Sequence, residues 1–333
     1  MAVVPLLAIR DLTVQFRVDA GWVTAIEGVS IDIGEGDCVG VVGESGSGKS
    51  VTALSVLRLH DRAATRIPSG SIIFQGLDLL TSSDRALRRI RGSEIAMIFQ
   101  DPMSSLNPVL TISEQISETL RQHQNMSEAA AQRRAVELLD LVRIPDASRR
   151  AGDYPHRLSG GMRQRVMIAM AIACRPRLLI ADEPTTALDV TIQAQILALM
   201  LDLQKELGMG LILITHDLGV VAQTAQRVIV MYAGKKVEEA DVETLFANPR
   251  HPYTRGLMAS IPAVPSLGGN ADARLVEIPG MVPSLTRLPK GCAFAPRCEF
   301  AIARCREEYP PLLSFEGDHL AACWRAAEIA GSS

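Results

Sequence analysis

A glycine-rich loop occupies positions 43–50 and reads Gly43-Glu44-Ser45-Gly46-Ser47-Gly48-Lys49-Ser50. It fits the pattern G-x-x-x-x-G-K-[ST] and lies between an apolar strand pattern and a helical pattern. Glycines let the backbone wrap closely around phosphate, so that successive N–H groups and the helix N-terminus face its negative charge. The pattern assigns Lys49 to the β and γ phosphates of a nucleotide and the Ser50 hydroxyl to Mg²⁺. An accidental glycine-rich turn is the alternative, which the strand and the helix around the loop disfavour.

Short apolar segments alternate with helical patterns on both sides of this loop. Strands are predicted at 9–16, 23–33, 38–42, 178–181, 211–214 and 227–232, and helices at 50–59, within 113–143 and at 190–207. Ser127, followed by Glu128, is the expected N-cap within 113–143. Strands that alternate with helices predict an α/β fold with a largely parallel sheet covered on both faces.

Two carboxylates, Asp182 and Glu183, follow the apolar run 178–181. In open α/β folds, ligands bind at the carboxyl ends of the strands. We expect Asp182 to hold Mg²⁺, usually through water, and Glu183 to polarise the water that attacks the nucleotide. Two acids that only cap the following helix are the alternative, and the phosphate loop elsewhere in the chain weighs against it.

Length and charge limit the classes of protein to which the chain can belong. Its 333 residues exceed the size at which one hydrophobic core usually keeps growing, so we expect a main domain and an appendage. Lys and Arg total 34 against 37 Asp and Glu, a net charge of −3, which lacks the basic field of a nucleic-acid-binding protein. The apolar runs are shorter than the roughly 18 residues of a membrane span. The apolar N-terminal stretch lacks a basic region and a cleavage site, so we expect no signal peptide.

The composition changes after about residue 246, where more than half of the 18 prolines lie. We place a domain boundary near 245, between a nucleotide-binding domain at 1–245 and a C-terminal extension at 246–333. Regular helix or strand should not dominate the extension.

A second motif narrows the range of nucleotide-binding proteins. It reads Leu158-Ser159-Gly160-Gly161-Met162-Arg163-Gln164-Arg165 and resembles the signature motif of ATP-binding cassette (ABC) proteins, at the family's spacing before Asp182. The resemblance implies an ABC-type P-loop NTPase domain with a RecA-like core, a β subdomain and a helical subdomain. Ser159, Gly160 and Gly161 begin a helix whose N–H groups can cap a phosphate. In the family that phosphate belongs to ATP on a second ATPase subunit, so the contact is made in trans.

Further elements of the family follow in order. Gln100 resembles the glutamine that touches Mg²⁺ and senses the membrane partner, and Ala187-Leu188-Asp189 resembles the loop that crosses the dimer interface. His216 resembles the switch histidine that contacts the γ phosphate. A lone histidine is more often structural, but its place after the strand 211–214 favours the catalytic role.

The aromatic side chain that stacks on adenine has two candidates. Members of the family use an aromatic residue of the early strands, and this chain offers Phe16 and Trp22. We prefer Phe16 because it ends the first predicted strand. Ordinary core packing is the alternative for either residue.

Two segments resemble one branch of the family, the importers of dipeptides, oligopeptides and nickel. One is the loop Gln100-Asp101-Pro102-Met103-Ser104-Ser105-Leu106-Asn107-Pro108, and the other is Asn248-Pro249-Arg250-His251-Pro252-Tyr253-Thr254-Arg255-Gly256-Leu257. The resemblance implies an ATPase that powers import of di- or oligopeptides. An importer of nickel, glutathione or another small solute is the alternative. A soluble, non-transport ABC ATPase is less favoured, because neither a second cassette nor a basic patch is visible.

This branch implies several partners. They are a second ABC ATPase subunit, more often a different chain than a second copy, two membrane permease subunits and an external solute-binding protein. The resemblance places the chain at the cytoplasmic face of the plasma (inner) membrane, as a peripheral subunit. ATP and Mg²⁺ are the implied cofactors, and we expect no nucleic acid.

Four of the six cysteines cluster in the proline-rich extension with the spacing C-x5-C-x6-C-x17-C. They are Cys292, Cys298, Cys305 and Cys323. A reducing cytoplasm disfavours disulfides, and the absence of a tight C-x2-C or C-x4-C pair disfavours zinc. Wide spacing on turn-rich loops suits an iron–sulfur cube, and the segment resembles the cysteine region of peptide-importer ATPases, in which a [4Fe-4S] cluster is known. We predict a structural [4Fe-4S] cluster, with zinc or no metal as alternatives.

Overall fold

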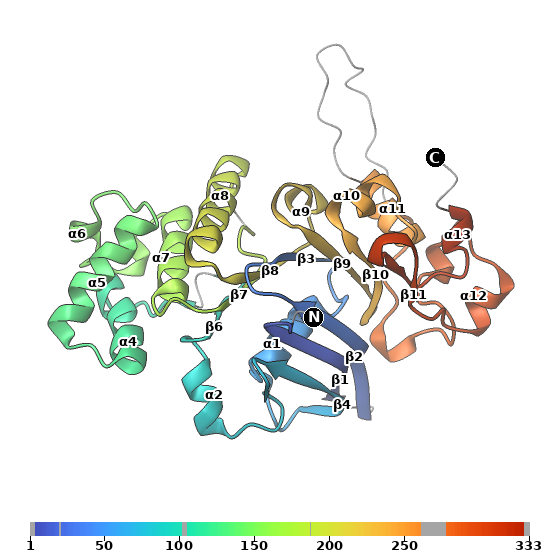
Figure 1. Cartoon of the computed structure of the whole chain (residues 1–333), viewed down its shortest axis with the longest axis horizontal. Helices are drawn as coiled ribbons and strands as arrows, with labels where there is room; N and C mark the ends of the chain where they lie inside the picture. Colours follow the sequence, from blue (N-terminus) through green and yellow to red (C-terminus); the bar gives the residue numbers. More distant parts are fainter. Residues whose placement is uncertain (1–3, 20, 102–104, 187, 261–277, 330–333) are drawn as a thin grey trace, which may run out of the picture. The chain divides into compact units, whose positions relative to one another are not determined.

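The computed structural model describes residues 4–19, 21–101, 105–186, 188–260 and 278–329 (Figure 1). The chain forms two compact units. The first unit comprises Met1–Leu7, Asp32–Cys38 and Ile73–Ile214. The second unit comprises Ala8–Ile31, Val39–Ile72 and Thr215–Ser333. The boundary expected near residue 245 stays a prediction.

Three parallel strands run through the first unit. Its elements are β5 (Leu77–Asp78), α2 (Asp84–Ile90), β6 (Ile95–Ile98), α4 (Ile112–Gln124), α5 (Glu128–Leu141), α6 (Ala147–Arg150), η1 (Pro155–Arg157), α7 (Gly160–Ile172), β7 (Leu178–Asp182), α8 (Val190–Leu207) and β8 (Gly210–Thr215). β7 pairs in parallel with β6 on one side and with β8 on the other, where Asp182 lies beside Ile214. Every residue of β7 and β8 is buried, as in a parallel sheet covered on both faces.

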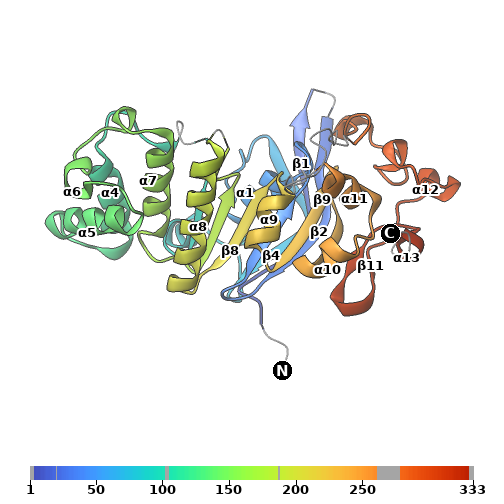
Figure 2. The same ribbon diagram turned by 90° about the horizontal axis from the view of Figure 1, so that it is seen from above.

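Four helices of the first unit, α4, α5, α6 and α7, contact one another and form a group (Figure 2). α4 begins at Thr111, which makes a capping box with Glu114, and it ends at Asn125 in the left-handed conformation. Ser127 is the N-cap of α5 and accepts a hydrogen bond from the N–H of Ala130, as the sequence predicts. The helical pattern within 113–143 is therefore two helices.

The second unit carries the glycine-rich loop and the C-terminal extension. Its elements are β1 (Leu7–Val18), β2 (Gly21–Ile33), β3 (Cys38–Val42), α1 (Lys49–Val56), β4 (Thr65–Phe74), α9 (Leu218–Thr224), β9 (Arg227–Tyr232), β10 (Lys235–Asp241), α10 (Val242–Ala247), α11 (Pro252–Ala259), η2 (Leu285–Arg287), η3 (Ala295–Arg297), α12 (Ala303–Glu307), β11 (Leu313–Ser314), η4 (Glu316–Asp318), β12 (Leu320–Ala321) and α13 (Ala326–Ile329). β3 is buried throughout and pairs in parallel with β9, which pairs antiparallel with β10. β2, β1 and β4 are neighbours in another sheet.

The C-terminal extension attaches to β10 through a buried carboxylate. β12 pairs antiparallel with β10, where Ala321 lies opposite Glu238. The fully buried Glu238 side chain accepts hydrogen bonds from the backbone N–H groups of Arg250 (2.6 Å) and His251 (3.1 Å). Its Oε1 also lies 2.7 Å from Nε2 of His319. One side chain therefore links two segments of the extension, around Arg250 and around His319, to the sheet.

Within the described part of the chain, none of the helices combines the length and the apolar character that crossing a membrane would require.

His251 makes stability depend on pH. The ring is buried, which lowers its pKa to about 4, and its Nδ1 accepts the N–H of Tyr253 at the start of α11. Below about pH 6.5 the unfolded chain binds a proton on this ring that the folded chain does not bind until about pH 4. We expect the free energy of unfolding to fall by about 3 kcal/mol as pH falls through this window.

The variant His251→Asn is the control for this pH dependence, because asparagine can accept the same N–H but does not titrate. Urea unfolding at pH 7 and pH 4.5 measures the change. The pH dependence should be smaller in the variant than in the parent, and equal slopes would contradict the assignment to His251.

Candidate functional site

The glycine-rich loop has the backbone that a phosphate cradle needs. Gly43, Gly46 and Gly48 have φ values of 152°, 80° and 100°, a region that L side chains rarely adopt. A Cβ at Gly43 would lie 2.2 Å from the carbonyl oxygen of Met231, and one at Gly48 would lie 2.5 Å from a methyl group of Ile26. The turn therefore favours glycine at all three positions, and close neighbours require it at Gly43 and Gly48.

Lys49 lies against this loop. It is the first residue of α1, 5% exposed, and its Nζ donates to the carbonyl oxygens of Gly43 (2.7 Å) and Glu44 (3.1 Å). Gly48, which has no side chain, is the N-cap, so the first N–H groups of α1 point into the loop. The amine and the helix N-terminus together favour a bound anion.

The serines of the loop differ in exposure. Ser45 is exposed, Ser50 is half-buried, and Ser47 is buried with a hydroxyl oxygen that makes no hydrogen bond within the described residues. A buried hydroxyl of this kind fits a ligand that supplies its partner. The geometry of the loop agrees with phosphate binding, and the role of each of its residues stays a prediction.

The predicted acids lie in the first unit, at the carboxyl end of β7. Asp182 is the last residue of the strand and is 5% exposed, and Glu183 follows it. The Oε2 atom of Glu183 accepts hydrogen bonds from Nε2 of Gln100 (3.1 Å) and from Oγ1 of Thr186 (3.0 Å). The structure thus brings Gln100 and Glu183 together, although 83 positions separate them in the sequence.

The backbone of Glu183 is in the left-handed region, at φ 47°. Its N–H donates to the carbonyl oxygen of Ile214 at 2.9 Å, which fixes the turn after β7 to the end of β8. A non-glycine residue held in this region stores strain, and such residues cluster at functional sites. The local geometry agrees with a catalytic role for Glu183.

The predicted dimer contact lies at the start of α7. Ser159 is the N-cap and accepts the N–H of Met162, and both Ser159 and Gly160 are exposed. A Cβ at Gly161 would lie 2.7 Å from a methyl group of Ile192 in α8. The helix N-terminus is thus accessible to an anion, and Gly161 permits α7 and α8 to pack closely.

Three further candidate residues lie in the second unit. His216 is exposed and follows the last residue of β8. Phe16 is half-buried in β1, and its ring makes a T-shaped contact with His60 at 5.2 Å between centroids. Trp22 is exposed, and the guanidinium of Arg66 lies 4.4 Å from its ring centroid. The choice of Phe16 as the adenine-stacking residue stays a prediction.

Four positions of the predicted motifs lie outside the described residues. They are Ala187 and the loop residues Pro102, Met103 and Ser104.

The prediction of a [4Fe-4S] cluster is wrong, and the zinc alternative finds no support either. Among the described residues, which include all four cysteines of the extension, no group of three or more His, Cys, Asp or Glu side chains could hold a metal ion. The four line an apolar cavity with room for about one water molecule, roughly 20 Å³. Burial raises the pKa of Cys292 to about 11 and that of Cys323 to about 12. In the cavity as it stands, burial therefore keeps these two thiols neutral near pH 7.

Comparison with known proteins agrees with the site. Residues 26–186 match the family model described as ABC transporter, and residues 237–305 match the model of the oligopeptide/dipeptide transporter C-terminal region. The "Probable peptide ABC transporter ATP-binding protein y4tR" of Sinorhizobium fredii is 55% identical over 97% of this chain and 96% of its own. The "Putative peptide import ATP-binding protein BMEII0863" of Brucella melitensis is 56% identical over 98% of each chain. This chain belongs to the ABC transporter ATP-binding proteins.

Solved structures support the cassette fold of this ABC ATPase. The ATP-binding cassette MJ0796, solved as a dimer in a post-hydrolysis state with ADP and Pi, is 29% identical with a TM-score of 0.64. It covers 71% of this chain, and the match covers 98% of that chain. CbiO1 from Clostridium perfringens is 26% identical with a TM-score of 0.62, over 73% of this chain and 91% of its own. The chain is an α/β ABC ATPase, and it hydrolyses ATP with Mg²⁺.

Proposed function

We propose that this ABC ATPase powers the import of di- or oligopeptides through a membrane channel formed by other subunits. The observation that carries the proposal is the match of residues 237–305 to the oligopeptide/dipeptide transporter C-terminal region. Relatives named as peptide ABC transporter or peptide import ATP-binding proteins, similar over nearly the whole chain, support the same cargo.

In the proposed reaction, the loop N–H groups and Lys49 bind the β and γ phosphates of ATP. Glu183 accepts the proton of the attacking water at its carboxylate, while Gln100, 3.1 Å from that carboxylate, orients it. His216 contacts the γ phosphate. The Ser50 hydroxyl and the Asp182 carboxylate are oxygen ligands of the kind that Mg²⁺ prefers. The bound ion would supply charge neutralisation between the phosphates.

The proposed assembly is a pair of ATPase subunits below two permease subunits, fed by an external solute-binding protein. The second ATPase is either another copy or a related chain. The exposed helix N-terminus at Ser159 and Gly160 supports a contact with ATP held by the other subunit. The assembly would place this chain at the cytoplasmic face of the plasma membrane.

Hydrolysis should therefore depend on association of two ATPase subunits. The rate per chain should rise with protein concentration and rise further when the partner ATPase is added. The variant Ser159→Arg, which places a bulky side chain at the trans contact, should lower the rate without changing the affinity of its own loop for nucleotide. Phosphate release across a dilution series measures this, and a fully active monomer would contradict it.

Cargo is tested with the complete transporter in proteoliposomes. Labelled di- and oligopeptides should accumulate only with the binding protein, MgATP and an active ATPase. Uptake of nickel or glutathione in place of peptides would refute peptide as the cargo.

A further inference from the structure

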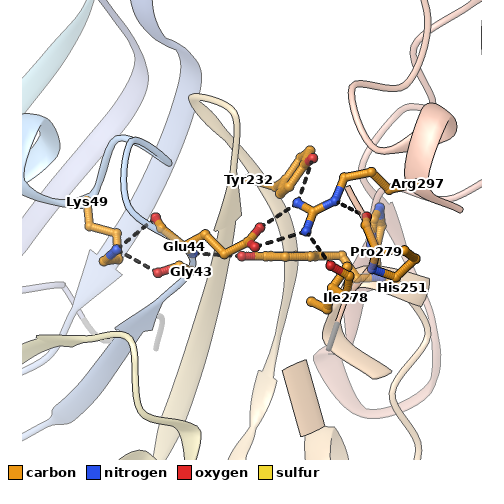
Figure 3. Close-up of polar contacts among 9 residues, drawn as sticks. Gly43, Glu44, Lys49, Tyr232, His251, Ile278, Pro279 and Arg297 are labelled. Atoms are coloured by element: carbon orange, nitrogen blue, oxygen red, sulfur yellow. Dashed lines mark hydrogen bonds and ion pairs between the residues drawn. The ribbon is translucent and has the colours of Figure 1, made fainter. Parts of the chain in front are cut away.

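A carboxylate lies within the phosphate loop, at Glu44, and an arginine of the C-terminal extension binds it (Figure 3). Nη1 of Arg297 is 2.7 Å from one carboxylate oxygen of Glu44, and Nη2 is 3.0 Å from the other. The side chain of Arg297 is 5% exposed and that of Glu44 is 31% exposed. This is the bidentate arrangement in which arginine binds carboxylates most strongly.

Arg297 is held rigidly in this position. Its Nε donates to the carbonyl oxygen of Pro279 (2.8 Å), Nη2 also donates to that of Ile278 (3.2 Å), and Nη1 also donates to the hydroxyl of Tyr232 (3.3 Å). With the two bonds to Glu44, all five N–H donors of the guanidinium are used. The hydrogen bonds to Glu44 raise the pKa of Arg297, so the group stays charged.

A second residue of the extension holds the backbone of the loop. The N–H of Glu44 donates to the hydroxyl oxygen of Tyr253 at 2.7 Å. Tyr253 is fully buried, and its ring packs against those of Tyr232 and Phe294, with centroids 4.6 Å and 5.5 Å away. An aromatic cluster therefore fixes the hydroxyl that holds Glu44.

The same loop segment carries the contacts of Lys49. Its Nζ donates to the carbonyl oxygens of Gly43 and Glu44 (Figure 3). Glu44 therefore contacts both the phosphate-binding amine, through its carbonyl oxygen, and the extension, through its carboxylate. A free carboxylate at Glu44 would repel the phosphates of ATP, because like charges in a partly buried site interact strongly. Arg297 neutralises this charge and fixes the direction of the side chain.

We propose that Arg297 and Tyr253 are positioning residues of the nucleotide site, through which the C-terminal extension holds the phosphate loop ready for ATP and neutralises Glu44. The inference rests on the proposed role of residues 43–50 as the ATP phosphate loop. A loop fixed before binding loses less conformational freedom when ATP binds, so the extension increases affinity. ATP affinity is thus a property of the extension as well as of the cassette.

The alternative is that the ion pair only stabilises the attachment of the extension to the cassette. The two roles predict different effects of the Glu44 charge on ATP affinity. If Arg297 serves to neutralise Glu44, removing the arginine leaves a negative charge beside the phosphates, and removing that charge as well restores binding. If the pair only stabilises the attachment, Arg297→Ala with Glu44→Gln binds ATP no more tightly than Arg297→Ala alone.

The experiment measures the Kd for a fluorescent ATP analogue with Mg²⁺ on the full chain, at 50 mM and 500 mM salt. Arg297→Ala should raise the Kd by about 10-fold, which equals about 1.4 kcal/mol. Glu44→Gln should change it by less than about 3-fold, and Arg297→Ala in the Glu44→Gln background should return toward the parent value. High salt should reduce the defect of Arg297→Ala, because salt screens the partly exposed charge of Glu44.

Further variants separate the possible failures. Arg297→Lys keeps the charge but not the bidentate pair, and Tyr253→Phe keeps the ring but not the hydroxyl. Each should therefore weaken ATP binding by less than Arg297→Ala does. Arg304→Lys is the matched control, since Arg304 lies in the same extension and pairs with the exposed Glu308. Circular dichroism and the melting temperature without nucleotide show whether each variant is folded.

The inference would be overturned if a folded Arg297→Ala protein bound the ATP analogue with the affinity of the parent. It would also be overturned if adding Glu44→Gln to Arg297→Ala did not restore affinity. If Arg297→Ala does not fold, Arg297→Lys and Tyr253→Phe still test the inference, since each should weaken ATP binding and parent affinity in both would overturn it. If Lys49→Ala also binds ATP normally, the phosphate loop assignment itself fails. Loss of binding in Lys49→Ala alone would refute only the inference.

Discussion

Replacing Glu183 by Gln is expected to lower the rate of ATP hydrolysis by about 10²-fold to 10⁴-fold, while ATP still binds. The carboxylate accepts hydrogen bonds from Gln100 and Thr186, and a glutamine amide oxygen can accept one of them in the same place. What the amide cannot do is take the proton of the attacking water. The loss should therefore appear in kcat, with little change in the Kd for ATP.

Steady-state phosphate release by the assembled transporter, together with equilibrium binding of ATP, checks this expectation. Glu206→Gln is the matched control, because Glu206 is exposed on α8 and the substitution removes the same charge. Normal turnover in the Glu183→Gln protein would show that another group removes the proton.

Local patterns predicted the parts of the fold that are locally determined. The strand 178–181 and the helix 190–207 lie within one residue of β7 and α8, because a continuous apolar run and a helical repeat each specify one element. The motif 43–50 likewise specifies its own conformation, since its glycines adopt positive φ values and its lysine begins α1. Here the sequence and the structure carry the same information.

Contacts between distant segments could not be predicted in this way. Glu44 and Arg297 are 253 positions apart, and no repeat or spacing connects them. An acidic residue inside a phosphate loop was the available signal, because a carboxylate beside phosphates needs a cation nearby. The arginine that supplies it becomes visible only when the extension is folded against the loop, since η3 places Arg297 there.

The cysteines show the opposite error, in which spacing was given too much weight. Cys292, Cys298, Cys305 and Cys323 do line one cavity, so their proximity was inferred correctly. Whether such a set holds metal depends on the arrangement of the sulfur atoms in space, and no group of side chains that could hold a metal ion is found among the described residues. Spacing along the chain does not report that arrangement.

The second large effect is expected for Lys49→Ala, which should raise the Kd for MgATP by about 10-fold to 10²-fold. The substitution removes a buried ammonium group that the carbonyl oxygens of Gly43 and Glu44 hold against the loop. Each hydrogen bond from a charged donor contributes about 1.5–3 kcal/mol, and the phosphates lose at least one such bond. Hydrolysis falls further, because the same charge stabilises the γ phosphate during transfer.

Lys205→Ala is the control for Lys49→Ala, since Lys205 is exposed on α8 and its loss changes the net charge equally. Titration calorimetry of both variants with MgATP gives the Kd values. Equal affinity of the two variants would mean that residues 43–50 do not bind the phosphates. A selective loss in Lys49→Ala, together with an intact melting temperature, would assign the effect to the ammonium group, because α1 and the loop glycines would still be folded.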